Sequence, residues 1–62
     1  MSEPGRLLII DDESAIRFAL CDYFRECGWE VDAAAEKEEA EALLAHTQYA
    51  VVIADLRLTG IY

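Results

Sequence analysis

Hydrophobic and polar residues follow one another along the chain with two different periods, and the strand-like segments come first. Residues 7–10 form an unbroken apolar run that two aspartates follow, which predicts a strand over about residues 6–11 that is buried on both faces. A second wholly apolar run predicts a strand over about residues 49–54, and an aspartate follows it too. Residues 29–33 alternate apolar with polar side chains, so the strand predicted over about 29–34 is half solvated.

Two helices are predicted between these strands. Residues 14–27 repeat apolar side chains at helical spacing, at Ile16, Ala19, Leu20, Tyr23, Phe24 and Cys27, and we expect this face to be the inward one. Gly28 follows as the residue that ends the helix. Residues 36–46 are rich in Ala, Glu and Leu and predict a second helix with an inward face of Ala40, Leu43 and Leu44.

The order of the strands follows from two rules. Crossovers between parallel strands are right-handed, and a strand that is buried on both faces lies inside a sheet. We therefore expect an α/β fold of the plan βαβαβ, in which the first strand is central, the half-polar second strand lies at an edge, and the order is 2-1-3. The helices then cover opposite faces. Ligands of open α/β sheets bind at the carboxyl ends of the strands where the winding reverses, here between the first and third strands.

Composition restricts the kinds of partner. Sixty-two residues with a net charge of −8 form at most one small domain, and this charge disfavours direct binding to nucleic acid or to an anionic membrane surface. No apolar run approaches the ~20 residues of a membrane span, and the first residues lack the layout of an export signal. We expect a cytoplasmic protein in which Cys21 and Cys27 are buried, reduced thiols.

Three aspartates stand at the predicted carboxyl ends of the two apolar strands. Asp11 and Asp12 follow the first and Asp55 follows the third. Neighbouring parallel strands lie ~4.8 Å apart, so the carboxylates can approach to about 5 Å. At that distance two charges repel by roughly 3 kcal/mol at an effective dielectric constant near 20. A Mg²⁺ ion would compensate this repulsion and would make phosphoryl transfer to a carboxylate feasible. The alternative is that Asp11 or Asp12 caps the first helix and Asp55 begins a loop.

Three segments of the sequence together resemble a known protein family. Residues 8–13 (LIIDDE), 28–31 (GWEV) and 51–60 (VVIADLRLTG) are similar to receiver domains of bacterial two-component response regulators, and the resemblance extends over residues 6–62. It implies a flavodoxin-like, doubly wound parallel sheet and a signalling module rather than an enzyme. Asp55 matches the phosphoacceptor, which takes its phosphoryl group from a sensor histidine kinase or phosphotransfer protein. Asp11 and Asp12 match the acidic pair that holds Mg²⁺, and the backbone carbonyl of Arg57 matches a further ligand.

The chain also departs from that family. Receiver domains are about twice as long, and the hydroxyl residue after their fourth strand and the lysine after their fifth have no counterpart here. We therefore expect weak metal binding and poor phosphotransfer from these 62 residues alone. The third strand would present an uncharged edge, which favours either a homo-oligomer or pairing with the missing C-terminal half.

Two other functions remain open. One is an interaction module that resembles a receiver domain but does not accept phosphate. The other is a fragment of a haloacid-dehalogenase-type phosphatase, although Asp12-Glu13-Ser14 lacks the second aspartate of the D-x-D motif. Arg17 lies one turn into the first helix, either leaning towards the acidic edge or solvated. His46 is expected on the surface.

Overall fold

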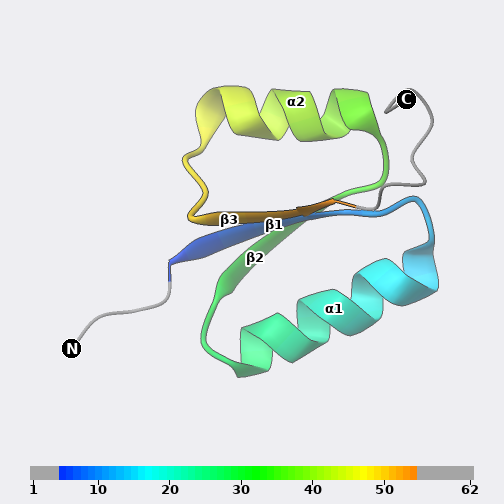
Figure 1. The fold of residues 1–62 in the computed structure, drawn as a ribbon, viewed down its shortest axis with the longest axis vertical. Coiled ribbons are helices and arrows are strands. Elements are labelled where there is room, and N and C mark those ends of the chain that lie inside the picture. The colour runs from blue at the N-terminus through cyan, green and yellow to red at the C-terminus, as the bar shows by residue number, and fades with distance from the viewer. Residues whose placement is uncertain (1–4, 55–62) are drawn as a thin grey trace.

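The computed structural model describes residues 5–54, and within them the chain forms the five expected elements (Figure 1). The strands are β1 (Arg6–Ile10), β2 (Glu30–Ala34) and β3 (Val51–Ala54). The helices are α1 (Ser14–Glu26) and α2 (Lys37–His46). The predicted helices begin or end one residue outside these bounds, and the predicted strands extend beyond the observed ones by one or two residues.

The strands form one parallel sheet in the order β2-β1-β3, as the sequence predicts. Leu8 of the central strand β1 pairs with Asp32 on one side and with Val52 on the other. Helices α1 and α2 cover opposite faces of the sheet (Figure 1). This arrangement is the α/β fold that the alternation of strands and helices predicts.

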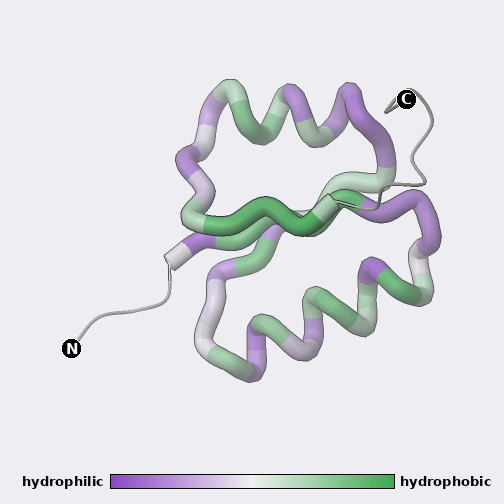
Figure 2. The backbone as a smooth tube through the Cα atoms, in the orientation of Figure 1, coloured by the Kyte–Doolittle hydropathy of each residue, from purple (hydrophilic) through white to green (hydrophobic). Residues whose placement is uncertain are grey.

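Strand β1 supplies buried side chains to both faces of the sheet because successive residues of a strand point in opposite directions. Leu8 and Ile10 pack with Ala34 and Ala40 on the α2 side. Leu7 and Ile9 pack with Cys21 and Val31 on the α1 side. The apolar colour therefore concentrates along the strands (Figure 2). This double burial explains why the sequence of β1 is an unbroken apolar run.

The end of α1 is fixed by backbone geometry. Gly28 follows the helix with a φ of 102°, which side chains with a Cβ rarely adopt. Its N–H donates to the carbonyl of Arg25 at 3.0 Å, and the N–H of Trp29 donates to the carbonyl of Phe24 at 3.0 Å. These two bonds make a Schellman motif, and Trp29 and Phe24 pack against the same buried cluster. Gly28 thus turns the chain from α1 into β2.

The predicted inward face of α1 is only partly correct. Leu20, Cys21 and Phe24 contact the core. Ile16, Ala19, Tyr23 and Cys27 are exposed, with Tyr23 at 60%. The predicted apolar face is wider than the surface that the sheet offers, so one row of side chains packs and the neighbouring row does not. The prediction of two buried thiols is therefore wrong for Cys27, whereas Cys21 is buried and both cysteines are free.

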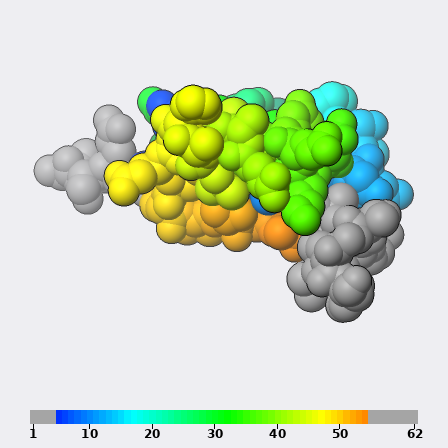
Figure 3. All heavy atoms as spheres, turned by 90° about the horizontal axis from the view of Figure 1, so that it is seen from above, coloured from blue at the N-terminus to red at the C-terminus, as the bar shows by residue number. Residues whose placement is uncertain are grey.

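One further burial prediction needs correction. Leu44 of α2 is 46% exposed, because the inward side of this helix is formed by Ala40 and Leu43. Strand β3 is wholly apolar, yet Val51 and Val52 are exposed. Within residues 5–54, β3 pairs with β1 alone and lies at the sheet edge. Seen from the α2 side, its atoms emerge uncovered beside the helix (Figure 3).

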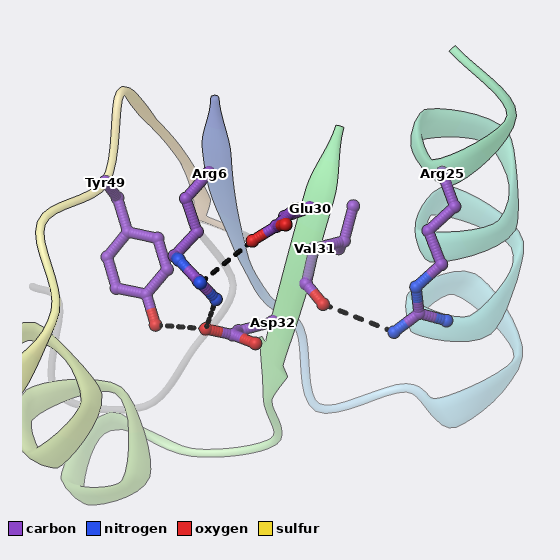
Figure 4. Close-up of polar contacts among 6 residues, drawn as sticks. All are labelled: Arg6, Arg25, Glu30, Val31, Asp32 and Tyr49. Atoms are coloured by element: carbon purple, nitrogen blue, oxygen red, sulfur yellow. Dashed lines mark hydrogen bonds and ion pairs between the residues drawn. The ribbon is translucent and has the colours of Figure 1, made fainter. Parts of the chain in front are cut away.

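The amino ends of the strands are joined by a polar cluster (Figure 4). The Tyr49 hydroxyl donates a hydrogen bond of 2.6 Å to the Oδ2 atom of Asp32. The guanidinium of Arg6 lies 2.8 Å from a Glu30 carboxylate oxygen and 3.5 Å from the same Asp32 oxygen. The cluster ties the segment before β3 to β2 across the start of β1. Neither described helix is long and apolar enough to cross a membrane.

Candidate functional site

The acidic residues predicted to form a site begin where β1 ends. Asp11 directly follows the strand and is 6% exposed, the one charged residue buried within the described part of the chain. Its N–H donates to the carbonyl of Ala34 at 3.1 Å, which continues the pairing of β1 with β2 by one step. Asp12 is exposed. The chain thus places a buried and a solvated carboxylate side by side at the carboxyl end of the central strand.

Asp11 is held at two further points. One oxygen of its carboxylate, Oδ1, accepts the backbone N–H of Glu13 at 2.9 Å. Its own carbonyl accepts a hydrogen bond of 2.7 Å from the Arg17 guanidinium, which reaches back from the first turn of α1. The helix itself begins without a side-chain cap: Glu13 occupies the N-cap position and makes no capping hydrogen bond through its side chain. Asp11 therefore organises the turn from β1 into α1 and does not cap the helix N-terminus.

The third predicted acid, Asp55, and Arg57 lie outside the described residues. The chain that leads to Asp55 is described as far as Ala54, the last residue of β3, which pairs with Ile10 of β1. The residues that follow this pair along the two strands are Asp55 and Asp11. Of the predicted site residues, the structure thus brings together Asp11 and Asp12.

The donor chemistry at this turn fits Mg²⁺. Carboxylate oxygens are the protein ligands that Mg²⁺ prefers, and it commonly uses one or two of them while keeping several waters. Within residues 5–54, the carboxylate of Asp11 accepts the N–H of Glu13, and this bond leaves further lone pairs for a cation. No cluster of three His, Cys, Asp or Glu side chains suited to a metal occurs within residues 5–54. The predicted set needs Asp55, which lies beyond that range.

The structure also decides between the two orientations that the sequence allows for Arg17. Its side chain leans to the acidic edge, and its guanidinium carbon also lies 5.6 Å from the centre of the Phe18 ring. The signal in the sequence was the position of an arginine one turn into a helix that follows the acidic pair. His46, at the end of α2, is exposed as expected.

Comparisons with known proteins agree with this geometry. Residues 7–62 match the family of response regulator receiver domains. The fold is similar to that of the chemotaxis response regulator CheY4 of Vibrio cholerae, with a TM-score of 0.86 and 28% sequence identity. The alignment covers 90% of this chain and 47% of CheY4, so the chain spans about half the length of that protein. The chain therefore belongs to the family of response regulator receiver domains.

Proposed function

We propose that this chain is the phosphoacceptor part of a two-component signalling system and that Asp55 receives the phosphoryl group. The observation that carries the proposal is the burial of Asp11 at the end of the central strand, beside the strand that leads to Asp55. Membership of the receiver family supports it, because that family consists of signalling modules. The sheet supplies two adjacent strand ends, and both continue into aspartates.

In this proposal Asp11 and Asp12 hold Mg²⁺ together with the Asp55 carboxylate and the backbone carbonyl of Arg57. The cation, when bound, neutralises charge on the phosphoryl group during its transfer. An oxygen of Asp55 forms the new bond to phosphorus while the bond from phosphorus to the donor breaks. The donor would be a phosphohistidine of a sensor histidine kinase or phosphotransfer protein, whose imidazole nitrogen is the leaving group.

Phosphorylation by a small donor tests the proposal. The chain is incubated with acetyl phosphate and Mg²⁺, and intact-mass spectrometry follows the gain of one phosphoryl group as acetate leaves. We expect the modification in the wild-type chain, at a low level, and its loss in Asp55→Ala. Asp22→Ala removes an exposed aspartate from α1 and serves as the matched control that keeps the modification.

The alternative function is an interaction module that accepts no phosphate. The coverage of about half of CheY4 favours it for these residues on their own, because catalytic positions of the remaining half would be absent. A wild-type chain that gains no phosphoryl group, or an Asp55→Ala variant that gains as much as the wild type, would contradict the phosphoacceptor role.

A further inference from the structure

We propose that Arg17 is a positioning residue that fixes the backbone of the acidic turn and so sets the metal affinity of Asp11 and Asp12. This inference deepens the proposed function and rests on it for the metal. The observation that carries it is the hydrogen bond of 2.7 Å from the Arg17 guanidinium to the carbonyl of Asp11. The contact is made to the backbone, and the carboxylate oxygens of Asp11 keep their remaining lone pairs for a cation.

Among the described residues, the hydrogen bond from Arg17 is one of three that restrain Asp11. The N–H of Asp11 donates to Ala34, its carbonyl accepts from Arg17, and its carboxylate accepts from the N–H of Glu13. The N–H of Asp11 restrains the preceding peptide plane through its bond to Ala34. The Asp11 carbonyl belongs to the peptide plane between Asp11 and Asp12, so this plane cannot rotate without breaking the hydrogen bond from Arg17. The orientation of this plane determines the direction in which the chain leaves β1 and hence the position of the exposed Asp12 carboxylate. Without the Arg17 hydrogen bond, the backbone at Asp12 would be able to change its conformation.

The position of Arg17 is itself restrained. The backbone N–H of Arg17 donates to the carbonyl of Glu13 at 2.9 Å, the first hydrogen bond of α1, and its guanidinium lies over the Phe18 ring. The side chain therefore spans from the first turn of the helix to the end of the strand, and it links α1 to the acidic turn. Partners that orient metal ligands in this indirect way typically change metal affinity by about 10–100-fold when they are removed.

Positioning and simple electrostatics predict opposite signs for an Arg17→Ala variant. Arg17 carries a positive charge close to the proposed cation, so removing it would by Coulomb repulsion alone strengthen Mg²⁺ binding. If the main role of Arg17 is to hold the turn, its removal weakens binding in spite of the lost repulsion. Arg17→Lys keeps the charge and a hydrogen-bonding nitrogen at the end of the side chain, and we expect it to keep most of the affinity.

Helix α1 offers a matched control at its other end. Arg25 donates a hydrogen bond of 3.2 Å from its guanidinium to a backbone carbonyl, that of Val31 in β2. Arg25→Ala therefore removes the same charge and the same kind of contact between α1 and the sheet, but far from the acidic turn. If these substitutions act by loosening the packing of α1 on the sheet, both variants lose Mg²⁺ affinity. If Arg17 positions the acidic turn, only Arg17→Ala loses it.

The experiment measures two quantities by NMR on the 62-residue chain: the Kd for Mg²⁺, and the hydrogen-exchange rate of the Glu13 amide without metal. We expect Arg17→Ala to raise the Kd by about tenfold and to speed exchange of that amide, and Arg25→Ala to change neither. An unchanged or lower Kd in Arg17→Ala would overturn the proposal. If the wild-type chain binds no Mg²⁺, the proposed metal site fails separately. The exchange rate of the Glu13 amide then tests the positioning role by itself. Equal rates in Arg17→Ala and the wild type would overturn that role.

Discussion

Tyr49 and Asp32 lie 17 residues apart in the sequence and form a short hydrogen bond between their side chains, at 2.6 Å. The hydroxyl of Tyr49 donates to a carboxylate that also faces Arg6. Hydrogen bonds to charged groups contribute more to stability than neutral ones, by roughly a factor of two. The ion pair of Arg6 with the largely exposed Glu30 contributes little by comparison. Tyr49 is therefore the residue through which this cluster stabilises the fold.

We predict that Tyr49→Phe lowers the free energy of unfolding by about 1–2 kcal/mol, because Asp32 loses the hydroxyl donor. Urea denaturation followed by far-ultraviolet circular dichroism measures the change. Tyr23→Phe is the matched control, since its ring is largely exposed on α1. We expect the control to stay within about 0.5 kcal/mol of the wild type. Equal effects of the two variants would show that the contact between Tyr49 and Asp32 adds no stability.

Tyr49 also predicts how stability depends on pH. Burial raises the pKa of Tyr49 above the ordinary 10.0, and the hydrogen bond and the negative charge of Asp32 raise it further. The Thr47 hydrogen bond and the positive charge of Arg6 lower the pKa in part. Because the folded chain resists ionisation more than the unfolded chain, this contribution is complete below pH 10 and is lost as pH rises through the folded pKa.

The difference in unfolding free energy between the wild type and Tyr49→Phe isolates this contribution. We expect the difference to be constant from pH 7 to about pH 9.5 and to shrink above about pH 10. Denaturation curves at a series of pH values measure it. A difference that grows with pH above 10 would contradict the direction of the pKa shift.

Helix α1 shows what a pattern of apolar residues predicts and what it leaves open. The spacing of apolar residues correctly predicts a helix, because only the helical period brings those side chains to one side. It cannot tell which of two neighbouring rows faces the sheet. Leu20 and Phe24 pack, whereas Ile16 and Tyr23 are exposed. That outcome depends on the rotation of α1 about its axis, which the contacts with β1 and β2 set.

The order of the strands was predictable for a different reason. The polar positions of β2 exclude it from the centre, and the apolar β1 requires cover on both faces. The same logic placed Asp11 and Asp12 at the carboxyl end of β1. The contacts of Arg17 with Asp11 and of Tyr49 with Asp32 could not be predicted, because each depends on the placement of a long side chain between elements.

The junction of α1 and β2 depends on the backbone conformation of Gly28. Gly28→Ala places a Cβ on a residue with a φ of 102°, and we expect it to cost about 1–2 kcal/mol of unfolding free energy. Gly28→Asn should cost less, because asparagine tolerates positive φ better. Thermal or urea denaturation of the three chains measures the order. An alanine variant as stable as the wild type would mean that the Schellman motif does not require the positive φ.

Strand β3 leaves an apolar edge of the sheet open within the described residues. Val51 and Val52 are exposed, and β3 is hydrogen-bonded to β1 alone there. An uncharged edge strand is a template for pairing with another chain, whereas the net charge of −8 opposes association. The balance between strand pairing and charge repulsion depends on ionic strength, because salt screens the repulsion between exposed charges.

We therefore predict that the 62-residue chain self-associates and that association increases with salt. Sedimentation velocity at several salt concentrations measures it, and Val52→Lys should reduce it by adding charge to the edge. Leu44→Lys is the matched control, because it adds the same charge to an exposed apolar residue of α2. A folded monomer of 7.0 kDa at every salt concentration would contradict the prediction.

In the proposed function, the acids following β1 and β3 share one divalent cation. NMR with Mn²⁺ in place of Mg²⁺ detects this sharing, because a bound paramagnetic ion broadens the signals of the residues around it. We expect the amide signals of Asp11, Asp12 and Asp55 to lose intensity at the same Mn²⁺ concentration, well before that of Glu30, which begins β2 at the opposite end of the sheet. An Asp55 signal that keeps its intensity while those of Asp11 and Asp12 disappear would contradict this sharing.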